Sequence, residues 1–207
     1  MFKVYINGIL ATLGIAIGGC AYLTIENKYI GALLFSIALI AVCVFEFSLF
    51  TSKIGGVLED FTVNKFLRVL CCLLGNITGC VIFGLIARLV SQELISSSVA
   101  ICQKKLTQPI ISTIVRGFFC GSLIYIAVRF YKQKDNFLGI LISIPTFILS
   151  GFEHSIADMF YFVVSGVVSL QVVLYLGFVI VGNSVGALII PLLEKLAKIF
   201  DKKENKA

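Results

Sequence analysis

The segment SGFEHSIADMF, residues 150–160, carries side chains that could handle a proton within an otherwise apolar stretch. It holds the single histidine of the chain, His154, which directly follows Glu153 and precedes Asp158. An imidazole gains and loses a proton near neutral pH, so His154 is a candidate to lend or attract a proton along a pathway. The alternative is a core histidine whose ring only satisfies structural hydrogen bonds.

The composition of the chain places this segment in a membrane protein. Of 207 residues, 59% are hydrophobic and 14% are charged, whereas soluble domains have roughly 45–50% apolar and about 25% charged residues. Apolar stretches near twenty residues recur along the whole length, which predicts a polytopic bundle of helices. We expect one transmembrane domain over residues 1–207, with residues 201–207 as a basic cytoplasmic tail.

The seven cysteines lie mostly within apolar stretches and include no CxxC pair. Zinc sites take several cysteine or histidine ligands at defined spacing, and one histidine excludes any set that uses two. We interpret the cysteines as small packing residues and expect no metal and no cofactor. The net charge of +6 is explained by membrane topology and anionic lipid, so no nucleic-acid partner is expected.

Six membrane-spanning helices are predicted from the apolar stretches. Their expected ranges are Tyr5–Thr24, Tyr29–Leu49, Phe66–Val90, Pro109–Tyr131, Phe137–Ser150 continuing past the histidine to Val168, and Gln171–Phe200. Six crossings put both chain ends on one side, and most lysines and arginines fall there; Lys28, Arg88, Lys104 and Lys105 fall on the other side, with Arg116 left open. Because positive loops stay inside, we expect a cell-membrane protein with both termini in the cytoplasm.

A short repeat predicts that the chain consists of two related halves. GNITG at residues 75–79 returns as GNSVG at residues 182–186. Upstream of each copy an apolar helix is interrupted, by LFTSKIGG in the second range and by SGFEHS in the fifth. We therefore predict an inverted repeat of three plus three helices, with halves at 1–108 (including a polar link over 91–108) and 109–200. Paired interrupted helices indicate a substrate site near the membrane midplane, although such glycines also serve close helix packing.

Buried ionisable groups in a membrane are costly and face the bundle interior or a water-filled path. A neutral histidine is tolerable there, but a lone carboxylate is not. We therefore expect Glu153 to find backbone N–H groups or a polar partner at the helix break, which leaves His154 facing the pathway.

These same residues resemble the formate/nitrite transporter family. GFEHSIADMF is similar to the Gly-Phe-Glu-His-Ser segment of that family, and SLFTS, residues 48–52, to its acid-Leu-Phe-Thr loop. RGFFCGSLIYIA, residues 116–127, resembles its fourth-helix signature and GNSVGALIIP its sixth-helix one. The likeness therefore runs along nearly the whole chain in the right order.

The resemblance implies an aquaporin-like protomer of six helices in a homopentamer, with one pore in each protomer. It implies apolar constriction residues at Phe35, Leu39, Phe50 and Phe147, although most phenylalanines of such a chain face lipid or core. It implies pore and proton-relay roles for Thr51, Glu153, His154, Asp158 and Asn183, and an anion-attracting vestibule lysine at Lys105. The expected partners are a small anion or its conjugate acid, protons, lipids and further copies of the chain.

The sequence departs from the family pattern at several positions. The fourth-helix asparagine is replaced by Gly121, which is expected to remove a pore-facing amide, and the acid before Leu-Phe-Thr is Ser48. The asparagine that follows the family histidine is Asp158. This carboxyl could stay protonated, pair with a basic group or repel anions.

Three functions are compatible with these patterns. The first is a proton-linked channel or transporter for formate, nitrite or hydrosulfide, which would pass as the neutral acid. The second is a channel of the same fold whose substrate has changed to a neutral solute or another weak acid, motivated by Asp158 and Gly121. The third is a membrane enzyme or a structural subunit. Enzyme activity is not expected, because the sequence shows no converging catalytic set.

Overall fold

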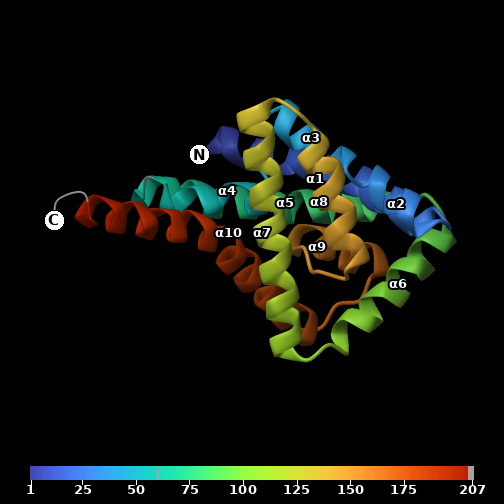
Figure 1. Cartoon of the computed structure of the whole chain (residues 1–207). Helices are drawn as coiled ribbons and strands as arrows, with labels where there is room; N and C mark the ends of the chain where they lie inside the picture. Colours follow the sequence, from blue (N-terminus) through green and yellow to red (C-terminus); the bar gives the residue numbers. More distant parts are fainter. Residues whose placement is uncertain (60, 205–207) are drawn as a thin grey trace.

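The computed structural model describes residues 1–59 and 61–204, and every regular element within these ranges is a helix (Figure 1). This confirms the prediction of an all-α protein. Four helices are long and apolar enough to cross a membrane: α1 (Phe2–Thr24), α5 (Val63–Ala87), α7 (Ile110–Lys134) and α10 (Leu170–Glu204). They coincide with the first, third, fourth and sixth predicted ranges.

The second and fifth predicted ranges are broken into shorter helices. The second comprises α2 (Lys28–Leu34) and α3 (Ile37–Val44), followed after an extended stretch by α4 (Phe50–Lys53) and a 3₁₀ turn, η1 (Gly55–Leu58). The fifth comprises α8 (Leu138–Leu149) and α9 (Ser155–Ser165). The break before α9 lies within the predicted SGFEHS segment, and the break before α4 ends where the predicted LFTSKIGG segment begins, whereas the interruption between α2 and α3 was not predicted. The polar link between the halves is itself helical, α6 (Gln92–Leu106).

The glycine repeat packs α5 against α1 and α10 against α7. A Cβ on Gly75 would lie 2.3 Å from the carbonyl oxygen of Tyr5, and one on Gly182 would lie 2.4 Å from that of Ile114. Real Cβ atoms do not approach backbone so closely, so both positions require glycine at these helix crossings. The packing interpretation of the repeat therefore holds at both copies.

The asparagine of each repeat holds one helix break in place. The amide nitrogen of Asn76 donates to the carbonyls of Gly8 and Ser48, at 2.8 and 2.9 Å, and its oxygen accepts from the Phe50 N–H at 2.8 Å. This amide is completely buried. The break before α4 is thus tied to both α1 and α5.

Asn183 repeats this arrangement at the second break. Its amide nitrogen donates to the carbonyls of Gly117 and Glu153, at 2.9 and 2.7 Å, and its oxygen accepts from the Ser155 N–H at 2.9 Å. We name these two sets of three bonds the asparagine clamps. The matched clamps support the predicted inverted repeat and its six crossings, which stay predictions.

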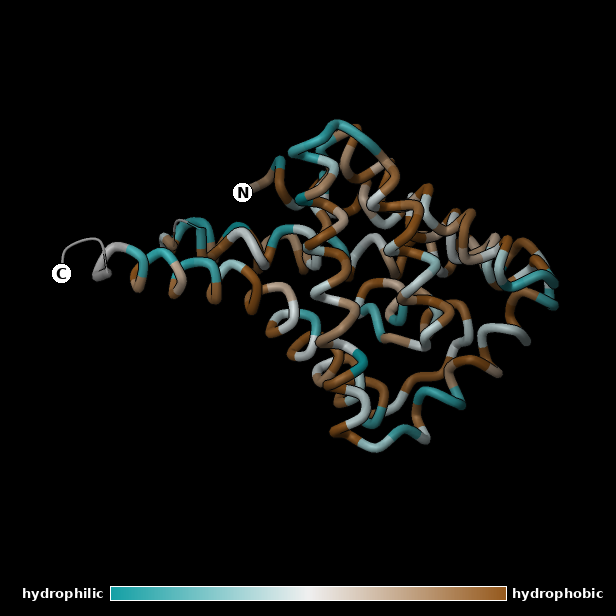
Figure 2. Tube along the Cα trace, in the orientation of Figure 1, coloured by the Kyte–Doolittle hydropathy of each residue, from teal (hydrophilic) through white to brown (hydrophobic). Residues whose placement is uncertain are grey.

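The two ends of the chain lie on the same face of the molecule. One surface recess is lined by Lys3 and Lys53, and a neighbouring one by Lys53 and Lys198. We call this the terminal face; Figure 1 shows the last turns of α10 projecting beyond the bundle there. In Figure 2 the helices of the bundle are mostly apolar, whereas polar and apolar residues alternate along the projecting part of α10.

A helix of α10's 35 residues is about 52 Å long, which exceeds the ~30 Å hydrocarbon core of a bilayer. The helix therefore continues into the predicted tail, of which residues 205–207 lie outside the described part.

Candidate functional site

His154 begins helix α9 and is fixed at both ring nitrogens. Its Nδ1 accepts the backbone N–H of Ala157 at 3.1 Å, which makes it the N-cap of the helix. Its Nε2 lies 2.9 Å from the hydroxyl oxygen of Thr51. Because Nδ1 accepts a hydrogen bond, the proton of the neutral ring must sit on Nε2 and point to Thr51. Both side chains are buried, at 3% and 1% exposure.

The contact between His154 and Thr51 joins the two helix breaks. Thr51 lies in the first turn of α4, directly after Phe50, whose N–H is held by the first asparagine clamp. His154 directly precedes Ser155, whose N–H is held by the second clamp. The clamps therefore set the position of both partners, although neither asparagine touches them through a side-chain hydrogen bond.

One cavity, which we call the vestibule, reaches His154 from the face opposite the termini. Its volume is about 260 Å³, and its lining includes Phe35, Phe147 and His154. The rings of Phe35 and Phe147 meet edge to face with centroids 6.3 Å apart, and Phe147 stacks on the imidazole with centroids 5.8 Å apart. The two phenylalanines thus form an apolar wall directly beside the histidine.

The remaining predicted constriction residues lie deeper in the protein. Leu39 and Phe50 are 2% and 3% exposed and are absent from the lining of the vestibule. Their role as constriction residues stays a prediction.

The vestibule also contains a cluster of buried charges. Lys105 pairs with Glu153 and, at 2.8 Å, with Asp158. Glu153 further accepts a hydrogen bond from Gln108 at 2.7 Å. We call Lys105, Glu153 and Asp158 the ion triad. Glu153 thus has the polar partners that were expected at the break. Asp158 was expected to stay protonated, to pair with a basic group or to repel anions, and the structure shows it paired with Lys105.

The triad changes the electrostatics of the predicted vestibule lysine. Burial by itself would lower the pKa of Lys105, but the Asp158 and Glu153 carboxylates outweigh burial and raise it, so the amine stays charged. Two carboxylates beside one ammonium leave little positive charge to attract an anion. Lys104 and Arg116 also line the vestibule, and Arg116 donates to the carbonyl of Gly151 at 2.7 Å.

The expectation that position 121 faces a pore is wrong. A Cβ on Gly121 would lie 2.1 Å from the carbonyl oxygen of Asn183. The position therefore faces the α7–α10 crossing, and glycine is required there because a side chain would push the helices apart. The departure from the family pattern at this residue concerns helix packing.

A second recess approaches Thr51 from the terminal face. Its volume is about 540 Å³, and its lining includes Ser48, Ser52 and Lys53, which flank Thr51 in sequence. We call it the pore-side recess. Within the described part of the chain, the contact between Thr51 and His154 thus lies between an opening on one face and an opening on the other.

This sequence is matched by the family model described as "Formate/nitrite transporter" over residues 1–197. The chain belongs to the formate/nitrite transporter family. Its members that match in structure are channels, and with its apolar helices the chain is a multi-pass membrane protein.

Two solved structures of the family share the fold. One, described as "FNT family ion channel", is 21% identical, with a TM-score of 0.78 over 94% of this chain and 88% of its own. The other, "Pentameric formate channel with formate bound", is also 21% identical, with a TM-score of 0.75 over 96% of this chain and 97% of its own. A search of curated proteins gave no match.

Sequence reasoning missed two residues of the site. Gln108, at the end of the polar link, bonds Glu153, and Arg116 bonds the break at Gly151. Arg116 opens the fourth-helix signature, but nothing in that motif indicates a contact with Gly151, and no local motif marks Gln108, which lies between α6 and α7. Asn183 was expected in the pore, but its amide is occupied by backbone groups, which favours a positioning role.

Proposed function

We propose that this protein is a channel that passes a small weak acid, such as formic acid, nitrous acid or hydrogen sulfide, across the cell membrane. The observation that carries the proposal is the buried hydrogen bond between Thr51 and His154, located between the vestibule and the pore-side recess. Family membership and the two channel structures support the same conclusion.

The phenylalanine wall favours the neutral acid over its anion. An isolated carboxylate loses its hydration on entering an apolar passage, and this costs many kcal/mol. A protonated acid carries no net charge and needs only hydrogen bonds to cross. Beside this wall the hydroxyl of Thr51, which accepts from the Nε2–H of His154, can still donate a hydrogen bond to the acid.

The hydrogen bonds of His154 support a polarising role for the ring. For the ring to act as a cationic acid, Nδ1 would have to carry a second proton, and the bond from the Ala157 N–H would be lost. A neutral ring keeps that bond and donates from Nε2 to Thr51. We therefore propose that His154 orients the Thr51 hydroxyl toward the solute and that water supplies the proton.

The topology and assembly of the channel follow the same reasoning. The excess of lysine and arginine on the terminal face favours a cytoplasmic location for both termini. We further propose a homopentamer with one pore per protomer, by analogy with the pentameric formate channel that shares the fold.

Uptake by proteoliposomes that contain an internal pH dye tests this function. Formate, nitrite, hydrosulfide and chloride are presented in turn to vesicles with purified protein and to vesicles without it. We expect a pH change with at least one of the three weak-acid anions and none with chloride. Silence with all three, from folded oligomers, would overturn the proposal.

A second candidate is a channel of the same fold for a neutral solute, and the ion triad is the observation that favours it. Asp158 and Glu153 neutralise Lys105, so the predicted vestibule lysine is not a free cation that would gather anions. Transport of an uncharged solute would not need one.

Asp158→Asn separates these two candidates. Removing one carboxylate leaves Lys105 paired only with Glu153, so the vestibule becomes more positive. For a weak-acid channel we expect the concentration of formate giving half-maximal uptake from this face to fall about tenfold. Glu93→Gln is the control, because it removes an exposed acid from α6. An unchanged concentration dependence in Asp158→Asn would show that Lys105 does not gather the anion.

A further inference from the structure

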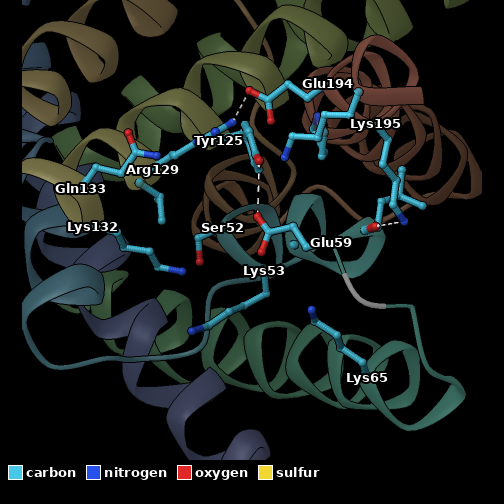
Figure 3. A pocket seen from close by; sticks show the side chains of 15 residues that line it. Ser52, Lys53, Glu59, Lys65, Tyr125, Arg129, Lys132, Gln133, Glu194 and Lys195 are labelled. Carbon is cyan, nitrogen blue, oxygen red and sulfur yellow. Dashed lines mark hydrogen bonds and ion pairs between the residues drawn. The ribbon is translucent and has the colours of Figure 1, made fainter. Parts of the chain in front are cut away.

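The largest recess of the terminal face among those described adjoins the pore-side recess, with which it shares Ser52, Lys53 and Lys132. Its volume is about 680 Å³, which is within the range of ~300–1,000 Å³ typical of ligand sites. Its walls come from α4 and η1, the start of α5, the end of α7 and the projecting part of α10. We call it the basic recess (Figure 3).

The basic recess carries more positive than negative side chains. Its cations are Lys53, Lys65, Arg129, Lys132, Lys195 and Lys198, and its two carboxylates are Glu59 and Glu194. Glu194 forms an ion pair with Arg129 at 2.6 Å, and Glu59 accepts a hydrogen bond from Tyr125 at 3.4 Å. Both carboxylates therefore interact with side chains of α7. The lysines of the recess carry a net positive charge that these carboxylates do not neutralise.

Three lysines without an ion-pair partner among the described residues line this recess together. In the part of the chain that the structure describes, Lys53, Lys65 and Lys132 form no ion pair. All three line the basic recess from different helices, and Figure 3 shows the amino groups of Lys53 and Lys132 near Ser52 and that of Lys65 on the other side, below Glu59. Burial, and then the neighbouring Lys132, lower the pKa of Lys53. Like charges gathered in this way favour binding of an anion that contacts several of them at once.

The walls of the recess are fixed by contacts between elements. Lys195 on α10 donates to the carbonyl of Leu58 in η1 at 2.8 Å. A Cβ on Gly55 would lie 2.4 Å from the ring of Tyr125 and 2.7 Å from the carbonyl of Ala187, so η1 is pressed against α7 and α10. The helices that carry the lysines are thus packed in place before a ligand binds, which lowers the entropic cost of binding.

We propose that the basic recess binds a polyvalent phosphate group. A monovalent anion such as formate would engage only a small part of a 680 Å³ recess with six cations. Phosphates accept several charge-assisted hydrogen bonds, and lysine binds them as a point charge. The group could belong to a soluble molecule or to a lipid headgroup, because α10 carries Lys195 and Lys198 to the membrane surface. This inference goes beyond the proposed transport function.

Binding to the full-length protein tests the proposal with one headgroup in two forms. Inositol trisphosphate is titrated into purified protein at ~0.15 M salt, where distant surface charges are screened. Phosphatidylinositol bisphosphate is presented in nanodiscs of otherwise neutral lipid. Saturable binding of the soluble form assigns a soluble ligand, and saturable binding of the lipid alone assigns a headgroup.

A pair of double variants locates the site. Lys65→Gln with Lys198→Gln removes two cations of the basic recess and is expected to weaken binding about 30-fold. Lys3→Gln with Arg68→Gln removes two exposed cations that line the pore-side recess, and we expect less than about a threefold change. Tm measurements confirm that both variants fold. Absence of binding by either probe, or equal weakening in both variants, would overturn the proposal. Because the measurement is binding, its outcome is independent of transport.

Discussion

Asn183→Ala is expected to lower the free energy of unfolding by about 3 kcal/mol or more. The substitution leaves the carbonyl of Glu153 and the N–H of Ser155 without their asparagine partner, whereas the Gly117 carbonyl keeps its hydrogen bond within α7. Asn183 is completely buried, so water cannot replace these bonds. Each unsatisfied buried group costs about 1–3 kcal/mol, against a total stability of roughly 5–15 kcal/mol for a typical protein.

Thermal unfolding in detergent measures this effect, and the expected drop in Tm is about 10 °C. Ser184→Ala is the matched control, because its hydroxyl only bonds back to the carbonyl of Ile180 one turn earlier on the same helix. We expect that control to stay within ~0.5 kcal/mol of the original protein. A loss below about 1 kcal/mol in Asn183→Ala would show that the clamp does not stabilise the break.

The asparagine clamps explain how a membrane protein can hold two broken helices. Each break frees backbone groups, and hydrocarbon offers them no partner. Asn76 and Asn183 supply both donors and acceptors from a neighbouring unbroken helix. The breaks can then present Thr51 and His154 to each other without exposing backbone to lipid.

The helix breaks and the clamps' residues were predictable because their signals are local. A run of polar and glycine residues inside an apolar stretch, as in LFTSKIGG and SGFEHS, disfavours a continuous helix. The repeated GNxxG motif marks the unbroken helices that pack nearby. Hydropathy also located every long helix to within a few residues at its ends.

The ion triad could not be predicted in the same way. Lys105 reaches Glu153 and Asp158 because α6 lies back against α9, and no local pattern in the polar link specifies that contact. The interruption between α2 and α3 was also missed, since no glycine or proline directly adjoins Phe35 and Ser36 in this apolar run. Such features depend on how distant helices pack.

His154→Asn is expected to reduce proton-coupled uptake of the transported acid about tenfold, the equivalent of one hydrogen bond worth ~1.4 kcal/mol. Asparagine is a favoured N-cap residue, so it can accept from the Ala157 N–H and keep α9 intact. Its shorter side chain cannot replace the Nε2–H that points at Thr51. The proteoliposome pH assay measures the loss, and Tm and oligomer size show whether the fold is retained.

Two changes at the partner residue test whether that hydrogen bond, and not the packing of the ring, matters for flux. Thr51→Val keeps the shape but removes the hydroxyl, and it is expected to reduce uptake as strongly as His154→Asn. Thr51→Ser keeps the hydroxyl and is expected to retain most uptake. If Thr51→Val fails while His154→Asn transports normally, the imidazole only caps α9, and the threonine alone contacts the solute. Equal failure of both, with the serine variant active, requires the hydrogen-bonded pair that joins the two breaks.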